Sequence, residues 1–410
     1  MPVDTYGYDI SFEEALSMVL GFLKRLSPVD LPVDEVCDLV AAEDLFASAD
    51  CPSATSSLKD GYAVVSKDIE GASKAHPVKL RVTGMSAAGD NMAGSVGPGL
   101  AIKVLTGARL PQGADTVIAV EFTREQANQV LCFKNAEPGR NVLFRGTDVE
   151  TGKLVVSKGE MLTPALTGLL AAGGVHQVPV FPKPGVAIVA TGDEVVAPGH
   201  ALKSGQVYAS NLVTLNSWLR HFGMPGKSVV VKDRSDEIRR TFTPIFSDVD
   251  ALVTSGGAWK SERDLTVRVL DEMGWELIFH RVRIGPGKAV AMGVLDGKPV
   301  FCLPGGPPSN EMAFLQLALP GLLQIAGRSP MPFGIKKVRL ASGVGGDSTW
   351  TQFYQAILER RGEEWWGVPL QMKSRIQSQA RAEALIKVPE GVDRLEVGDL
   401  IEVQVLLSGP

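Results

Sequence analysis

Short apolar runs alternate with amphipathic segments between about residues 180 and 327. The apolar runs predict buried strands at 185–190, 228–231, 251–253, 277–282 and 300–303. Apolar residues at helical spacing predict helices at 211–222, 235–246, 264–273 and 309–325. Continuous apolar strands between amphipathic helices are typical of a parallel sheet that is covered on both faces. We therefore expect a doubly wound α/β domain here.

The segments on either side of this region have different patterns. Ser11 and Glu14 form a capping-box pattern at the start of a predicted helix at 11–26, and a second helix is expected between Thr163 and Gly174. Short β-rich runs between turn residues then predict a β-rich domain, and strand-like runs near the C-terminus suit a small β barrel. We expect an α/β plus β multidomain protein with these domains: a helical and linker domain at 1–44 and 151–178, the β-rich domain at 45–150, the α/β domain at 179–327 and the C-terminal β barrel at 328–410.

Composition and charge disfavour several classes of protein. A net charge of −5 and a pI near 5.7 argue against a general nucleic-acid binder, which needs a basic face. The chain has no apolar run of about 18 residues and no basic, apolar leader, so neither a membrane span nor a signal peptide is expected. The four cysteines are widely spaced without a C-x-x-C pair, which favours a reducing, cytoplasmic compartment.

Small and acidic residues follow several of the predicted strands. Right-handed crossovers would bring the loops after these strands to one edge of the sheet. There, glycine amides and a helix N-terminus can bind phosphate, a lysine can neutralise charge, and carboxylates can hold Mg²⁺. The residues concerned are Thr191, Gly192, Glu194, Asp233, Ser255, Gly256, Gly257, Glu262, Asp264, Pro286, Gly287, Lys288, Pro304, Gly305 and Ser309, the last of which we expect to open a helix.

Each of these features alone also fits a structural role. A single Gly-rich turn is more often a plain tight turn, and Asp233 alone fits a helix cap equally well. Their joint occurrence at four strand ends is what predicts a site for a phosphate-bearing ligand and a divalent metal. The chain has neither a Walker A pattern nor G-x-G-x-x-G, which disfavours a P-loop NTPase and a dinucleotide-binding protein.

A set of motifs occurs in a fixed order along the chain. In one-letter code they are D-G-Y-A-V from Asp60, T-G-A-x-x-P-x-G-A-D from Thr106, R-G-x-D ending at Asp148, T-G-D-E from Thr191, S-G-G from Ser255, P-G-K from Pro286 and L-P-G-x-P-x-S ending at Ser309. This ordered set resembles the molybdopterin molybdenumtransferases, which include MoeA and the gephyrin E domain of animals, and it spans nearly the whole chain. The run from Ser374 and Arg375 resembles the C-terminal site loop of the same family.

The resemblance implies an enzyme of molybdenum cofactor biosynthesis that inserts molybdate into adenylylated molybdopterin with Mg²⁺ and releases AMP. It implies a MoaB-like α/β domain and a homodimer whose cleft joins this domain to the β-rich domain of the other subunit. A molybdopterin adenylyltransferase is an expected partner, whereas nucleic acid and membranes are not. The implied catalytic residues are Asp60, Asp148, Glu194, Asp233 and Asp264; the metal ligands are Asp233, Glu262 and Asp264; and the binding residues are Thr106, Thr191, Gly192, Ser255, Gly256, Gly257, Pro286, Gly287, Lys288, Pro304, Gly305, Ser309, Ser374 and Arg375.

The chain also departs from the pattern of the family. Gly285 replaces the first lysine of K-P-G-K, Ala209 replaces an acid, Gly306 replaces the asparagine of G-N-P, and Gln355 stands at a basic position. The arginine run before Asp148 is reduced to a single arginine, Arg145. Lost cations weaken an anion site, because charge-assisted contacts are among the stronger hydrogen bonds. The candidates to substitute for them are Lys260, Arg263 and Arg375.

Three hypotheses about function follow. The first is the molybdenum-inserting enzyme, which the retained Asp60, Asp233 and Asp264 favour. The second is a divergent paralogue that binds the pterin or handles another oxyanion such as tungstate, which Gly285, Ala209 and Gln355 favour. The third is a non-catalytic dimeric scaffold, which predicts no pterin binding. The sequence does not choose between molybdate and tungstate.

Overall fold

The computed structural model describes residues 7–90, 94–224, 226–257 and 265–406. The chain forms two compact units. One comprises the described residues of Met1–Ser27 and Phe181–Pro410, and the other is Pro28–Val180. The first unit contains the α/β domain and a barrel, and the second contains the β-rich region.

The sheet of the α/β domain is mixed. Four neighbouring strands, β18, β15, β19 and β22, run parallel, whereas β21 runs antiparallel to both β22 and β20. The expected parallel sheet is thus correct for these four strands and wrong at β21, which was not among the expected strands. Asp296 and Gly297 form the two-residue turn between β21 and β22, with φ of 48° and 77°, and so short a loop joins only antiparallel strands. The strands are β18 (Gly226–Val231), β15 (Val186–Thr191), β19 (Ala251–Ser255), β22 (Lys298–Leu303), β21 (Ala291–Leu295), β20 (Glu276–Gly285) and β1 (Gly7–Ser11), which pairs with β20.

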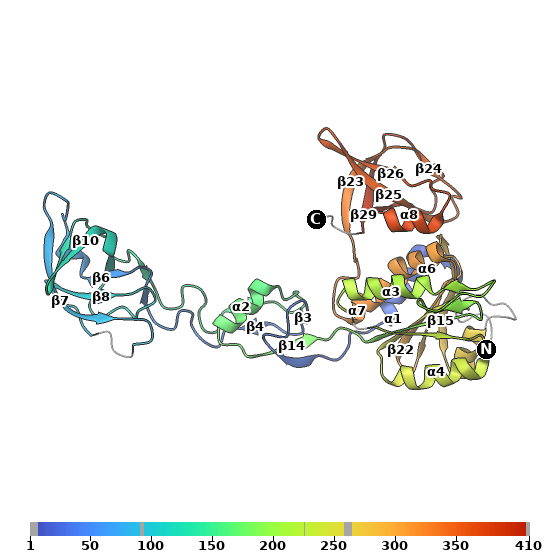
Figure 1. The fold of residues 1–410 in the computed structure, drawn as a ribbon, viewed down its shortest axis with the longest axis horizontal. Helices are drawn as coiled ribbons and strands as arrows, with labels where there is room; N and C mark the ends of the chain where they lie inside the picture. The colour runs from blue at the N-terminus through green and yellow to red at the C-terminus, as the bar shows by residue number, and fades with distance from the viewer. Residues whose placement is uncertain (1–6, 91–93, 225, 258–264, 407–410) are drawn as a thin grey trace. The chain divides into compact units, whose positions relative to one another are not determined.

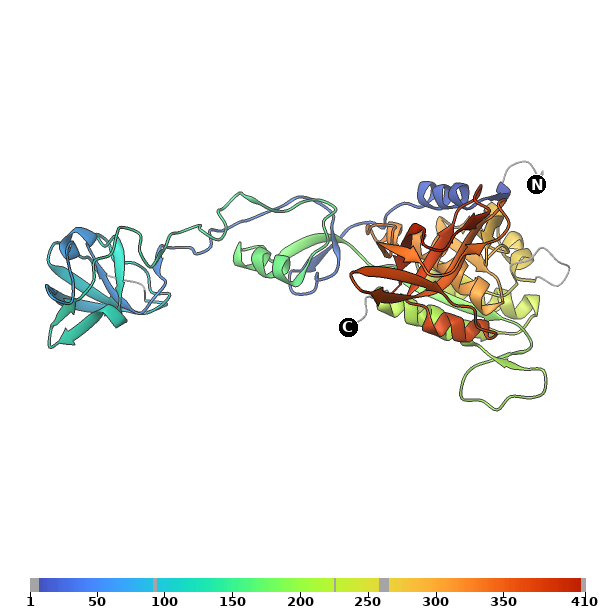
Figure 2. The same ribbon diagram turned by 90° about the horizontal axis from the view of Figure 1, so that it is seen from above.

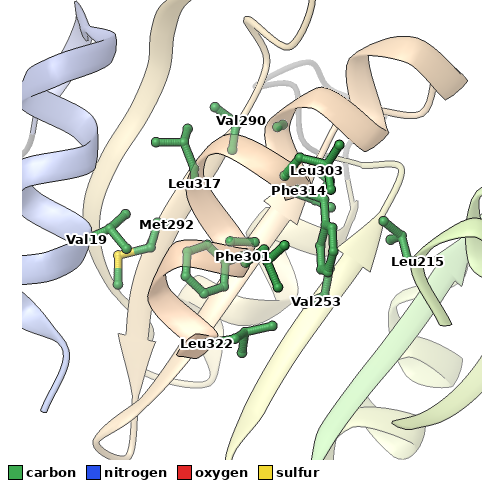
Figure 3. Packing of buried hydrophobic residues seen from close by; sticks show 14 of the residues in the cluster. Val19, Leu215, Val253, Val290, Met292, Phe301, Leu303, Phe314, Leu317 and Leu322 are labelled. Atoms are coloured by element: carbon green, nitrogen blue, oxygen red, sulfur yellow. The ribbon is translucent and has the colours of Figure 1, made fainter. Parts of the chain in front are cut away.

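Helices cover both faces of this sheet (Figure 1). The core on one face includes α1, α3 and the helix that runs from α6 into α7, and the core on the other includes α4 and α5. In Figure 3, Val19 of α1, Leu215 of α3 and Leu322 of α7 lie near Val253 and Phe301 of the sheet, all in one buried cluster. The helices are α1 (Phe12–Phe22), α3 (Ser210–His221), α4 (Ser235–Ser247), α5 (Leu265–Glu272), α6 (Pro307–Ala313) and α7 (Leu319–Ile325), with the π-helical turn Phe314–Ala318 between the last two.

The first helix begins where its capping box predicts. The Ser11 hydroxyl accepts from the Glu14 backbone N–H at 3.2 Å, and the Glu14 carboxylate accepts from the Ser11 N–H at 2.9 Å. The helix ends at Phe22 rather than at 26, and its Phe12 ring packs against that of Phe353, with centroids 5.5 Å apart. The described residues up to Ser27 therefore belong with the α/β unit, whereas we expected them to group with 151–178.

Five strands close the C-terminal β barrel that we expected, drawn in orange and red in Figure 2. Its helix α8 contacts α6 of the α/β domain, so that the barrel adjoins the carboxyl edge of the sheet. The elements are β23 (Gly334–Leu340), β25 (Thr351–Arg361), β26 (Glu364–Pro369), β27 (Ala384–Val388), β29 (Leu400–Val405), α8 (Arg375–Arg381), and the short pair β24 (Val344–Gly345) and β28 (Arg394–Leu395).

The second unit contains separate hydrophobic clusters. A six-stranded sheet holds two of them, and another lies beneath α2 and a small three-stranded sheet. The division of the whole chain into four domains remains a proposal. The elements are β10 (Thr123–Gln126), β11 (Gln129–Cys132), β7 (Val78–Ser86), β8 (Leu100–Val104), β6 (Gly61–Val64) and β9 (Thr116–Ala119) in the larger sheet; β2 (Val29–Pro32), β14 (Gln177–Phe181) and β3 (Val40–Ala41) in the smaller one; the pairs β4 (Leu45–Phe46) with β13 (Leu154–Val156) and β5 (Ser56–Ser57) with β12 (Val142–Leu143); and α2 (Pro164–Ala172).

No helix among the described residues is long and apolar enough to cross a membrane.

Candidate functional site

A cavity of about 500 Å³ opens at the carboxyl ends of β15 and β19. These strands are neighbours, but the helices that follow them, α3 and α5, pack on opposite faces of the sheet. The cavity therefore lies at a topological switch point, where open α/β sheets bind their ligands. Of the residues predicted from the sequence, eight line it: Thr191, Glu194, Asp233, Ser255, Gly256, Gly257, Pro304 and Gly305.

The Gly256-Gly257 turn brings the backbone close to its neighbours. Gly256 has φ +98° and Gly257 has φ +65°, conformations that residues with a Cβ rarely adopt. A Cβ at Gly256 would lie 2.9 Å from the Thr191 carbonyl oxygen, and one at Gly257 would collide with the Thr266 hydroxyl. Glycine is therefore required at both positions. The Gly256 N–H donates to the Leu303 carbonyl at 3.1 Å, so the Gly257 N–H is the one that this turn can present to the cavity.

Two asparagines hold the Ser255 hydroxyl at the end of β19. The side-chain amide of Asn211, in the first turn of α3, donates to the Ser255 Oγ at 3.2 Å and to the Gly305 carbonyl at 2.8 Å. The amide of Asn310 donates to the same Oγ at 3.1 Å and to the Pro304 carbonyl at 2.8 Å. The loops after β19 and β22 are therefore tied together through Ser255.

Two carboxylates lie at the cavity on the β15 and β18 side. Glu194 and Asp233 both line it and are exposed. Beside them, the Lys232 ammonium donates to the Asp193 carbonyl at 2.8 Å, so it is tied to the loop after β15. The Asp233 backbone N–H donates to the Asp193 carboxylate at 3.4 Å, which links the loops after β15 and β18.

These carboxylates have the chemistry of magnesium ligands. Mg²⁺ prefers oxygen ligands and takes one or two carboxylates, with phosphate and water completing the octahedron. Glu194 and Asp233 fit that requirement, although no group of three or more His, Cys, Asp or Glu side chains within the described residues could hold a metal ion alone. The other predicted ligands, Glu262 and Asp264, lie outside the described residues, as do Lys260 and Arg263.

Several predicted binding residues have other surroundings. The Lys288 ammonium lies 4.9 Å from the centre of the Trp350 ring in the barrel. Ser374 caps α8 by accepting from the Gln377 N–H at 3.3 Å, and Ser309 stands inside the first turn of α6, which opens at Pro307. None of the following lines the described part of the cavity: Gly192, Pro286, Gly287, Lys288, Ser309, Ser374 and Arg375.

Among the residues of the site that were not predicted, three bear on its geometry. Asn211 and Asn310 hold Ser255, and Ile376 of α8 lines the cavity beside the predicted Arg375. The position of Asn211 at the start of the helix after a βα loop is a signal that the sequence carried. Asn310 had none beyond its place next to Ser309.

The predicted residues of the second unit lie on its β-rich part. One oxygen of the Asp60 carboxylate accepts from both the backbone N–H and the hydroxyl of Thr106, at 2.7 and 2.8 Å, and these bonds hold the pKa of Asp60 below its usual value. The Asp148 carboxylate lies 3.9 Å from the Cys51 sulfur. The only arginine left from the family's run, Arg145, pairs with Asp50. The Thr151 backbone and hydroxyl, followed by this arginine, lower the pKa of Asp50 to about 2.

Three protein-family models match successive parts of the chain, and together they include most of both units. Residues 10–174 match the MoeA N-terminal region (domain I and II), 187–324 match a probable molybdopterin binding domain, and 337–406 match the MoeA C-terminal region (domain IV). The molybdopterin molybdenumtransferase of Haemophilus influenzae is 31% identical over 322 residues, 78% of each chain. That of Bacillus subtilis is 27% identical over 407 residues, 97% of this chain and 94% of the relative. The crystal structure of a molybdopterin biosynthesis MoeA protein from Pyrococcus horikosii aligns with 98% of this chain and 100% of its own, with 35% identity and a TM-score of 0.82. The chain therefore belongs to the molybdopterin molybdenumtransferase (MoeA) family.

Proposed function

We propose that this protein inserts molybdate into adenylylated molybdopterin and releases AMP, as a transferase of molybdenum cofactor biosynthesis. The observation that carries the proposal is the cavity at the β15–β19 switch point, which lies in the part of the chain that matches the molybdopterin-binding domain. Relatives that bear the name of this enzyme match the chain almost from end to end, which does not favour a scaffold or a paralogue of another activity.

The pterin nucleotide is the ligand that this cavity would hold. The Gly257 N–H and the Ser255 hydroxyl offer hydrogen-bond donors to a phosphate, and the N-terminus of α6 lies at the same edge of the sheet. The barrel contributes Ile376, an apolar side chain that can cover one side of a bound ring system. The cavity is thus polar at the strand ends and apolar toward α8.

Mg²⁺ is proposed as a cofactor, held by Glu194 and Asp233 and by oxygens of the ligand. When bound, the ion would neutralise phosphate charge and polarise the bond that releases AMP. Glu262 and Asp264 are proposed as further ligands from the residues that the structure does not describe.

The β-rich unit is proposed to complete the site in a homodimer. Asp60 is held ionised by Thr106, and its second oxygen accepts no hydrogen bond from the described residues. A carboxylate so placed can orient a water molecule or the pterin at the reacting phosphate, and Asp148 is proposed to act beside it. Since the substrate is already adenylylated, a molybdopterin adenylyltransferase is proposed to supply it.

The test is AMP release from purified adenylylated molybdopterin when molybdate is added. The wild-type protein should release AMP in a molybdate-dependent manner, and it should restore molybdoenzyme activity to a bacterial strain that lacks the transferase. Asp233→Asn should lower the rate by about a hundredfold or more, a typical effect of removing an electrostatic catalytic group. Asp236→Asn is the matched control, because Asp236 lies on the exposed face of α4 and its side chain is 72% exposed. A wild-type protein that neither releases AMP nor restores activity at any molybdate concentration would refute the proposal.

A further inference from the structure

The Ser255 hydroxyl has an unusual set of hydrogen-bond partners. Ser255 lines the cavity but is only 5% exposed, and Asn310 is only 1% exposed. The side-chain amides of Asn211 and Asn310 both approach the Ser255 Oγ, at 3.2 and 3.1 Å. Whether this buried hydroxyl donates to each amide or accepts from it depends on which group the amide turns toward it, the NH₂ group or the oxygen.

The main-chain carbonyls fix the orientation of both amides. Asn211 Nδ2 lies 2.8 Å from the Gly305 carbonyl oxygen, and Asn310 Nδ2 lies 2.8 Å from the Pro304 carbonyl oxygen. A carbonyl oxygen can only accept, so the atom facing it must be the NH₂ group of the asparagine. An NH₂ group carries two protons. Each asparagine therefore gives one proton to a carbonyl and has the other for Ser255.

This arrangement leaves the Ser255 hydroxyl able to act toward a further partner only as a hydrogen-bond donor. A hydroxyl carries one proton and two acceptor lone pairs. Two N–H donors occupy both lone pairs, so the proton must take the remaining direction around the oxygen. Within the described part of the chain the hydroxyl donates to no residue. The cavity that Ser255 lines is therefore where its proton can find an acceptor.

We infer that Ser255 is a committed hydrogen-bond donor in the cavity, that Asn211 and Asn310 are its positioning residues, and that it selects a ligand oxygen that can only accept. This inference rests on the proposed function, in which that oxygen belongs to the phosphate of the pterin nucleotide. A phosphate oxygen fits, because it offers only lone pairs. A ligand N–H at the same place would meet a hydroxyl with no lone pair left, and a buried donor without a partner is costly.

The test measures AMP binding to the full chain by calorimetric titration at constant Mg²⁺. Ser255→Ala should weaken AMP binding by about ten- to a hundredfold, the usual loss for one hydrogen bond to a charged group. Ser210→Ala is the matched control. Ser210 lines the same cavity, but no asparagine among the described residues donates to it, and the loss in Ser210→Ala should stay within about threefold.

The positioning role has a separate readout. In Asn310→Asp a carboxylate replaces the donor, so the Ser255 proton should turn toward residue 310 and away from the ligand. AMP binding should fall as far as in Ser255→Ala, and the double variant should show no further loss, because both changes remove the same bond. Asn211→Asp makes the same test at the less buried amide, and it decides the matter if Asn310→Asp does not fold.

The possible outcomes separate this inference from the proposed function. If AMP binds to the wild type and Ser255→Ala binds it equally well, or no worse than Ser210→Ala, the committed donor is refuted while the nucleotide cavity stands. If the losses of Ser255→Ala and of the aspartate variants add in full, the asparagines are structural and do not act through Ser255. If the wild type does not bind AMP at millimolar concentration, the inference and the nucleotide site fall together.

Discussion

Replacing Gly256 with alanine should destabilise the α/β unit, and the structure gives the size of the effect. At φ +98° an alanine is strained by about 1–3 kcal/mol. In addition, its Cβ would lie 2.9 Å from the Thr191 carbonyl oxygen, which belongs to the neighbouring strand β15 and cannot rotate away. Gly305→Ala is the matched control. Gly305 lines the same cavity, but its φ is not in the left-handed region and a Cβ there would have its nearest neighbour 3.8 Å away, at the Gly256 Cα.

Tryptophan fluorescence during urea unfolding measures this prediction directly. The tryptophans are at 218, 259, 275, 350, 365 and 366, so the signal comes from the first unit and not from residues 28–180. Gly256→Ala should lower the midpoint of the transition. Gly305→Ala should change the free energy of unfolding by no more than an ordinary surface substitution does, about 0.5 kcal/mol. Equal midpoints in the two variants would show that the turn relaxes freely and that glycine is not required at 256.

Four further predictions concern other parts of the molecule. Asp60 should titrate below the usual range of an aspartate in a carboxyl NMR experiment. Because its pKa is lowered in the folded state, the stability that this carboxylate contributes is present at neutral pH and is lost as the pH falls through the lowered pKa. Thr106→Val should raise the pKa of Asp60 only part of the way to its usual value, because the Thr106 backbone N–H lowers it more than the hydroxyl does and remains in the variant. A full return to the usual value would show that the hydroxyl, not the N–H, is the main cause. Gly285→Lys should lower the molybdate concentration that half-saturates AMP release by about tenfold, since a Cβ there meets no atom closer than 3.5 Å; no change would show that the lost lysine is unimportant. Ser11→Ala should destabilise the first helix by about 1 kcal/mol in thermal unfolding, with Ser17→Ala as the control outside the cap, and equal melting would argue that tertiary packing alone fixes the helix start.

Local patterns in the sequence were enough to predict the strands and helices that form the cavity. The apolar runs that became β15, β19 and β22 are bounded by turn residues, and the parallel pairing of these strands brings Thr191, Ser255 and Pro304 to one edge. The strand β21 was missed, although Asp296 and Gly297 are a strong hairpin signal in the sequence. The run from Ala291 to Leu295 contains Gly293, a residue that weakens a strand pattern, and was not assigned to a strand.

Contacts between residues distant in sequence could not be predicted. Asn310 meets Ser255 because α6 starts directly above the end of β19, and this depends on the order of strands in the sheet rather than on any local pattern. Ile376 reaches the cavity because the barrel packs its helix α8 against α6, where the Glu311 carboxylate accepts from Gln379 at 2.6 Å. A sequence motif can nominate Arg375 as a binding residue, but only the packing of the barrel shows that Ile376 is the neighbour that lines the cavity.

The losses of basic residues and the Ser255 arrangement bear on the same question, which is how this chain binds an anion. The arginine that remains before Asp148 is paired with Asp50, and Lys288 lies against Trp350. No lysine or arginine is among the described residues that line the cavity. Among the described residues, the donors that a phosphate would meet there are neutral groups in fixed positions, namely the Gly257 N–H and the Ser255 hydroxyl. Neutral donors discriminate by direction more than by charge, which is why the two asparagines that orient Ser255 matter more in this chain than they would beside a full set of lysines.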